Sequence, residues 1–104
     1  MSSALTALSP LDGRYAASAQ ALRPFFSEFG LIRYRVRIEL EWLKALAAEP
    51  AVKALKPFDR HALAAMDRLV EQFSERDAGQ IKNIEAETNH DVKAIEYWLK
   101  GRLA

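Results

Sequence analysis

The chain has 104 residues, half of them hydrophobic and 28% charged, with a formal net charge of +1 and no cysteine. This length and composition suit one small globular domain. The near-neutral charge argues against binding to nucleic acid or to an anionic membrane, and the lack of cysteine excludes disulfides and thiolate metal sites. No apolar run approaches the roughly 20 residues that span a bilayer, and the first ten residues do not resemble a secretory signal, so we expect a cytoplasmic protein.

The N-terminal segment predicts a loop followed by one short helix. Pro10 and the Asp12–Gly13 pair are turn signals within this loop. A short helix is expected from about residue 16 to residue 22. It would end before Pro24, because the residue that precedes a proline disfavours helical geometry.

The stretch from Ile32 to Trp42, IRYRVRIELEW, alternates apolar and charged residues. On period alone this pattern is typical of an amphipathic strand, but three features favour a helix. The 11 residues exceed the usual strand length of about 5–6. The run continues directly into LKALAAE, which is made of strong helix formers, and the chain has no second alternating run to pair with it.

As a helix, this segment is apolar on two faces. One stripe contains Ile32, Val36, Leu40, Leu43 and Ala47, and the other contains Tyr34, Ile38, Trp42 and Ala45. A helix of this kind is buried on two sides, inside a larger bundle or at a subunit interface. We therefore expect exposed apolar surface where a missing remainder would pack. Arg35 and Glu39, four residues apart, would form a surface ion pair or serve a specific interface.

Pro50 ends this long helix, and a further helix is predicted after it. Asp59 is its candidate N-cap. His61 lies in its first turn and is expected to be a solvated surface residue. The apolar stripe of the helix is made of Leu63, Met66, Leu69, Val70 and Phe73.

Two more helices complete the predicted chain. Residues 74–77, SERD, match a capping box and open a helix that continues to about Glu87. Its buried side is made of Ala78, Ile81 and Ile84. The last helix carries Gly101 inside its final turn and has one apolar face, made of Val92, Ile95, Leu99 and Leu103. The fold class is therefore all-α, with four to five helices joined by short connections.

A first polar cluster, DGRY, covers Asp12 to Tyr15. A turn that presents an arginine beside a tyrosine can hold an anionic, aromatic ligand, because guanidinium binds phosphate or carboxylate and phenol offers a hydrogen bond or a stacking face. The structural alternative is a turn in which Arg14 is solvated and Tyr15 enters the core. Spacing alone favours this alternative.

A second polar cluster, TNHD, covers Thr88 to Asp91 at the start of the last helix. It matches a capping pattern in which Thr88 caps the helix and Asp91 complements the helix dipole. The same helix start could bind an anion, with His90 as a donor and Asn89 as donor and acceptor. Asp91 would repel a bare anion, and would instead orient a neighbouring donor or accept from a ligand hydroxyl.

Neither histidine belongs to a recognisable zinc motif, and the four glycines are scattered rather than grouped in a phosphate loop. No zinc site and no phosphate-binding loop is therefore expected.

Taken together, SPLDGRY, FSEFGLIRYRVRIELEWLKAL and IEAETNHDVKAIEYWLK resemble the N-terminal domain of the adenylosuccinate lyase family. The likeness is greatest to the proteobacterial form, and it covers the whole chain. The resemblance implies membership of the fumarase/aspartase superfamily, whose enzymes are all-helical homotetramers with active sites built from three subunits. It also implies that this chain lacks the central bundle of long helices.

The resemblance implies an elimination of fumarate from adenylosuccinate, giving AMP, and from SAICAR, giving AICAR, without metal or cofactor. Arg14 and Tyr15 match the family's contacts to the phosphate end of the nucleotide. Asn89, His90 and Asp91 match a stretch that lines the same site, where His90 would support catalysis as a donor to the substrate. The family's general acid and general base lie in regions that this chain does not contain, so the chain by itself is predicted to be inactive.

Two other hypotheses remain open. One is a related superfamily enzyme such as argininosuccinate lyase, which DGRY and TNHDVKA disfavour. The other is a free-standing helical interaction module that would bind partners through the two-faced helix. Self-association of the chain through its exposed apolar surface is also expected.

Overall fold

The computed structural model describes residues 3–103, and within this range it contains helices and no strand. The all-α prediction is therefore confirmed. Five α-helices and two short 3-10 helices follow one another: η1 (Pro10–Asp12), η2 (Gln20–Leu22), α1 (Arg23–Phe26), α2 (Glu28–Ala48), α3 (Arg60–Glu71), α4 (Glu75–Thr88) and α5 (Asp91–Leu103). The chain forms two compact units, Met1–Leu31 and Ile32–Ala104, and each is described by itself.

In the first unit, the predicted helix over residues 16–22 begins later than expected. Residues 13–19 form successive turns, and only Gln20–Leu22 is helical, as η2. Pro24 follows in the first turn of α1. Proline is compatible with a first helical turn, because its fixed φ suits the helix and its missing N–H would have had no partner there. Pro24 therefore starts a helix in this chain.

Ser27 separates α1 from α2. Its hydroxyl donates to the Arg23 carbonyl at 2.5 Å and accepts from the Gly30 N–H at 3.0 Å, which makes it the N-cap of α2. A Cβ on Gly30 would lie 2.7 Å from the Pro24 carbonyl oxygen. The sharp bend at Ser27 therefore requires a residue without a side chain at position 30.

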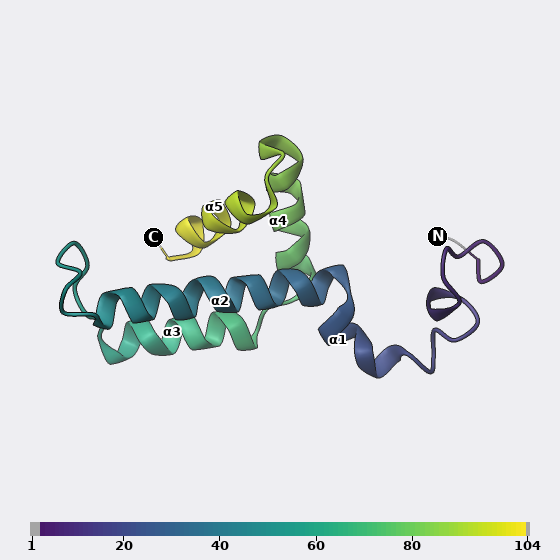
Figure 1. Cartoon of the computed structure of the whole chain (residues 1–104), viewed down its shortest axis with the longest axis horizontal. Helices are drawn as coiled ribbons and strands as arrows, with labels where there is room; N and C mark the ends of the chain where they lie inside the picture. Colours follow the sequence, from purple (N-terminus) through teal and green to yellow (C-terminus); the bar gives the residue numbers. More distant parts are fainter. Residues whose placement is uncertain (1–2, 104) are drawn as a thin grey trace. The chain divides into compact units, whose positions relative to one another are not determined.

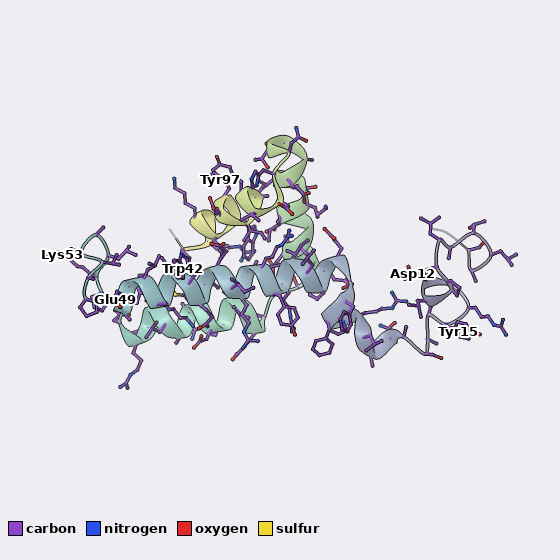
Figure 2. All side chains as sticks on the ribbon, viewed as in Figure 1. Asp12, Tyr15, Trp42, Glu49, Lys53 and Tyr97 are labelled. Atoms are coloured by element: carbon purple, nitrogen blue, oxygen red, sulfur yellow. The ribbon has the colours of Figure 1, made fainter. Side chains whose placement is uncertain are left out.

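The alternating stretch is helical, as predicted, and lies within the 21 residues of α2. Its first stripe is the buried one, because residues three and four apart share a helix face, and the fully or almost fully buried members are Ile32, Val36, Leu40 and Ala47. The second stripe is largely exposed: Ile38 is 64% and Trp42 61% accessible. Figure 2 labels Trp42, together with the exposed Tyr97 of α5.

Helix α3 lies alongside α2 (Figure 1), and an ion pair between Lys44 and Asp67 joins the two helices. Asp59 caps α3 as predicted, accepting from the Ala62 N–H at 2.8 Å. Met66 is buried, and His61 is exposed as expected.

Helices α4 and α5 form a hairpin and pack against each other. The predicted capping box is present, because Ser74 and Asp77 each bond the other's backbone N–H. The indole N–H of Trp98 donates to Gln80 Oε1 at 3.0 Å, and its ring meets Phe73 edge to face at 5.5 Å. Side chains that are almost fully buried here are Ile81, Ala94 and Ile95. No helix among the described residues is long and apolar enough to cross a membrane.

Candidate functional site

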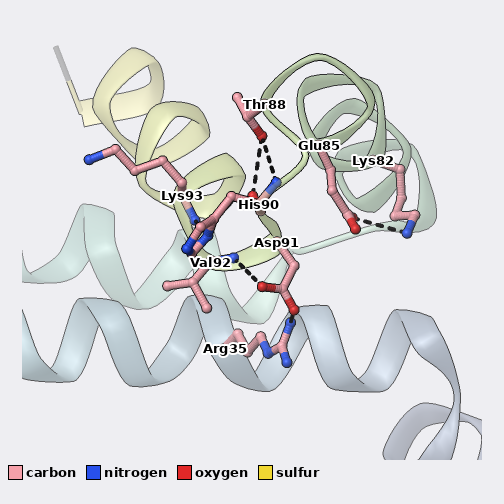
Figure 3. A network of polar contacts seen from close by, with 8 residues as sticks. All are labelled: Arg35, Lys82, Glu85, Thr88, His90, Asp91, Val92 and Lys93. Atoms are coloured by element: carbon pink, nitrogen blue, oxygen red, sulfur yellow. Dashed lines mark hydrogen bonds and ion pairs between the residues drawn. The ribbon is translucent and has the colours of Figure 1, made fainter.

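The second polar cluster forms the turn between α4 and α5 (Figure 3). Helix α4 ends at Thr88, and Asn89 follows in the left-handed conformation, with φ 54° and ψ 30°. Asparagine tolerates this conformation better than most residues with a side chain. The Asn89 N–H still donates to the Glu85 carbonyl at 2.8 Å. The left-handed residue therefore reverses the chain at once, and α5 can begin only two residues later.

The prediction that Thr88 caps the last helix is wrong. Thr88 is the final residue of α4, and its hydroxyl bonds the N–H and the carbonyl of His90 at 3.3 and 3.2 Å. The cap is His90, whose Nδ1 accepts from the Lys93 N–H at 3.2 Å. Because Asn89 delays the start of α5 to Asp91, the third N–H of that helix belongs to Lys93, within reach of His90 instead of Thr88.

This hydrogen bond restricts the tautomer of the neutral imidazole. A ring nitrogen that accepts carries no proton, so the neutral ring must carry its proton on Nε2. Nε2 then becomes a donor, and His90 is exposed at the surface. His90 is therefore arranged to donate a hydrogen bond to an anion or a carbonyl, while its other nitrogen stabilises α5.

Asp91 is held at both carboxylate oxygens. Its Oδ1 accepts from the Val92 N–H at 2.8 Å, and its Oδ2 accepts from Arg35 Nη1 at 2.5 Å. The Arg35 guanidinium, with the Val92 N–H as a second cause, lowers the pKa of the Asp91 carboxyl. Asp91 lies in the first turn of α5, where a negative charge complements the helix dipole, as predicted.

The predicted surface pair of Arg35 with Glu39 is therefore wrong, because Arg35 pairs with α5 instead of with its own helix. An ion pair at i,i+4 stabilises a helix only slightly. The pair with Glu39 is therefore weaker than a pair with a carboxylate that is already fixed at a helix start. The pairing also changes the electrostatics of the turn. The positive charge of Arg35 compensates the negative charge of Asp91, so an anion near His90 would not meet an uncompensated carboxylate.

The first polar cluster lies in the other compact unit. Arg23 holds its turn, since Nη1 pairs with Asp12 Oδ1 at 3.3 Å and Nη2 donates to the Leu11 carbonyl at 3.4 Å. A Cβ on Gly13 would lie 2.7 Å from the Ala4 carbonyl oxygen, so the turn leaves no room for a larger residue there.

Arg14 and Tyr15 are both exposed at this turn. The Arg14 guanidinium carbon lies 5.2 Å from the centre of the Tyr15 ring, and Tyr15 is 46% accessible. The alternative in which Tyr15 enters the core is therefore wrong. An arginine against an aromatic ring at the surface leaves its N–H groups available to an anion.

Two residues at these clusters were missed by reading the sequence: Arg35, which holds Asp91, and Arg23, which holds Asp12. No local spacing could have indicated the first, because 56 positions separate the partners. The structure describes the clusters in separate units, so the prediction that they line one site stays a prediction. Among the described residues, no group of three or more potential ligands is arranged to hold a metal ion.

Comparison with known proteins shows close relatives. No family model matches the chain. It is 52% identical over 102 residues to adenylosuccinate lyase of Escherichia coli strain K12 and 52% identical over 101 residues to that of Haemophilus influenzae. It is 50% identical over 102 residues to adenylosuccinate lyase of Vibrio cholerae. These matches cover 97–98% of the chain, which spans only 22% of the length of these relatives.

Proposed function

We propose that this chain, a homologue of the N-terminal part of adenylosuccinate lyases, is the substrate-contacting N-terminal domain of such a carbon–nitrogen lyase. The whole enzyme would eliminate fumarate from adenylosuccinate to give AMP, and from SAICAR to give AICAR, in purine biosynthesis. The observation that carries the proposal is 52% identity over 102 of the 104 residues, a span that includes both polar clusters.

The substrate of this reaction is an anion that carries a phosphate and two carboxylates. We assign Arg14 and Tyr15 to its phosphate end, and Asn89, His90 and Asp91 to another wall of the same site. The exposed Arg14 and the available Nε2–H of His90 support this assignment, because both are donors suited to phosphate or carboxylate. Residues 1–15 would form the substrate-contacting loop and residues 16–104 the helical part of the domain.

The chain supplies binding groups and not the acid–base pair. Elimination needs a base that removes the proton β to the leaving nitrogen and an acid that protonates this nitrogen. His90 is the only histidine in the two clusters, and its Nδ1 already accepts from Lys93, so it suits donation to bound substrate. The acid and base would come from the remaining part of the enzyme, and the isolated chain would be inactive.

The exposed stripe of α2 supports the assembly of this chain with more protein. Large apolar side chains such as Ile38 and Trp42 are rarely left together at the surface of a protein that acts alone. The complete enzyme would be a cytoplasmic homotetramer that covers this stripe, and the chain by itself would self-associate through it.

A chimera tests the proposal. This chain would replace the matching segment of the Escherichia coli lyase, and fumarate release from adenylosuccinate would be measured for the chimera and for the isolated chain. We expect turnover by the chimera only. Arg14→Ala and His90→Ala should each lower kcat/KM by at least about tenfold, in the range for loss of a charge-assisted hydrogen bond.

Lys53→Ala is the matched control, because Lys53 is exposed in the loop between α2 and α3 and belongs to neither cluster. A folded tetrameric chimera without turnover would contradict the lyase proposal. Turnover that is indifferent to both Arg14 and His90 would instead support a helical interaction module that contributes assembly and no substrate contact.

A further inference from the structure

The contact between Arg35 and Asp91 joins the N-terminal half of α2 to the first residue of α5. Arg35 Nη1 lies 2.5 Å from Asp91 Oδ2, and the two residues are 56 positions apart. In Figure 3 the arginine reaches from α2 to the turn that carries His90. This ion pair connects a residue of the second polar cluster to another helix.

Three sets of contacts restrain this turn. The Thr88 hydroxyl bonds the N–H and the carbonyl of His90, and the Lys93 N–H donates to the His90 imidazole. The Asp91 carboxylate accepts from the Val92 N–H. All of these lie within six residues of one another, so they shape the turn but do not fix it relative to its surroundings. Arg35 supplies the tie to α2, whose Ile32, Val36 and Leu40 are anchored in the core.

We propose that Arg35 is a positioning residue for substrate binding, which holds Asp91, and through it the Asn89–His90 turn, in the orientation that presents the His90 Nε2–H to an anionic substrate. The inference rests on the proposed function and names a residue outside both polar clusters. Asp91 then has a defined role: one carboxylate oxygen accepts from Arg35, and the other accepts from the Val92 N–H at the start of α5.

A purely stabilising role is a poor explanation for this pair. Ion pairs with access to solvent contribute little to stability, and Asp91 is exposed while Arg35 is half-buried. We expect Arg35 to affect substrate binding instead, by orienting the turn and by compensating the charge of Asp91. Without Arg35, Asp91 would present an uncompensated negative charge beside the donor, and a phosphorylated dicarboxylate would be repelled.

The chain offers a matched control in Lys44. It is also a cation of α2 that pairs across to another helix, through Asp67 of α3, but it touches neither polar cluster. Arg35→Gln and Lys44→Gln each remove one interhelical ion pair. Only the first should affect the turn.

The first measurement uses the chimera with the Escherichia coli lyase. Arg35→Gln should raise KM for adenylosuccinate about tenfold or more, since small displacements of binding groups have effects of this size, with a smaller change in kcat. Arg35→Lys should recover part of the loss, because it keeps the charge without the fork of the guanidinium. Lys44→Gln should leave KM and kcat within about twofold of the parent chimera.

The second measurement needs no turnover. Two-bond nitrogen–proton NMR spectra of the chain report which nitrogen of each histidine carries the proton, and His61 serves as the internal reference. In the parent chain His90 should be the Nε2–H form. Arg35→Gln frees Asp91, the first residue of α5, and so loosens the turn that holds the Lys93 N–H against Nδ1. It should therefore shift His90 toward a mixture of both tautomers, while His61 stays unchanged and Lys44→Gln leaves both rings unchanged.

The two measurements separate the inference from the proposed function. If Arg35→Gln matches Lys44→Gln in both KM and the tautomer of His90, Arg35 has no positioning role and the inference is wrong. If the parent chimera lacks turnover, the lyase proposal fails, and the inference then stands or falls on the tautomer of His90 alone.

Discussion

The backbone N–H of Lys93 donates to His90 Nδ1 at 3.2 Å, so the side chain expected to meet a ligand also caps α5. The two roles use different nitrogens and are compatible in one neutral ring. They can also be separated by substitution, because other residues can cap a helix without offering an imidazole donor.

His90→Asn and His90→Ala separate capping from binding. Asparagine is among the best N-caps, whereas replacing a cap by alanine costs about 0.5–2 kcal/mol. We expect His90→Ala to lower the free energy of unfolding of the chain by about 1 kcal/mol and His90→Asn to leave it nearly unchanged, as measured by urea denaturation. Both variants should lower kcat/KM in the chimera. Equal stability of the two variants would show that the cap contributes nothing.

Asn89 adopts φ 54°, which makes the turn sensitive to the residue at this position. Asn89→Ala should destabilise the chain by about 1 kcal/mol, because a Cβ without a compensating polar group is strained in the left-handed region. Asn89→Gly should be close to neutral in stability, because glycine adopts this conformation without strain. Urea unfolding of both variants checks this. Because both lose the amide, substrate binding by the chimera should weaken in both.

The Arg35–Asp91 pair predicts a specific pH dependence of stability. The folded chain lowers the pKa of Asp91 below its ordinary value of 3.8. The pair therefore makes a small contribution to the stability of the folded chain above about pH 4, and this contribution is lost as the pH falls through the lowered pKa. Thermal unfolding between about pH 3 and 6 should show a smaller decrease in Tm for Asp91→Asn than for the parent chain. Parallel curves for the two proteins would contradict this assignment.

Two isoleucines on different helices test which apolar surface belongs to the core. Ile95 is 1% accessible and Ile38 is 64% accessible. Ile95→Val should cost about 0.5–1.5 kcal/mol, while Ile38→Val should change the free energy of unfolding by less than about 0.5 kcal/mol. Both substitutions have the same effect on helix propensity, so urea denaturation compares burial directly. A large cost at Ile38 would indicate that the chain already covers this face, for example by self-association.

The sequence by itself determined the longer helices and much of their buried faces. The capping box of Ser74 and Asp77, the cap at Asp59 and the stripe through Ile32, Val36 and Leu40 were all predicted correctly. Each depends on residues that lie within three or four positions of each other, where helix geometry alone decides which groups meet. The relationship to a lyase was likewise visible in short motifs and is supported by the relatives.

Only the tertiary structure decided the partners at the turn. The left-handed Asn89 shifts the start of α5 and transfers the cap from Thr88 to His90. The packing of α5 near α2 brings Arg35 to Asp91 across 56 positions, in place of Glu39 on its own helix. The second outcome has no local signature, because a contact between segments 56 positions apart depends on how the helices pack. The chemistry proposed for this domain depends on those contacts.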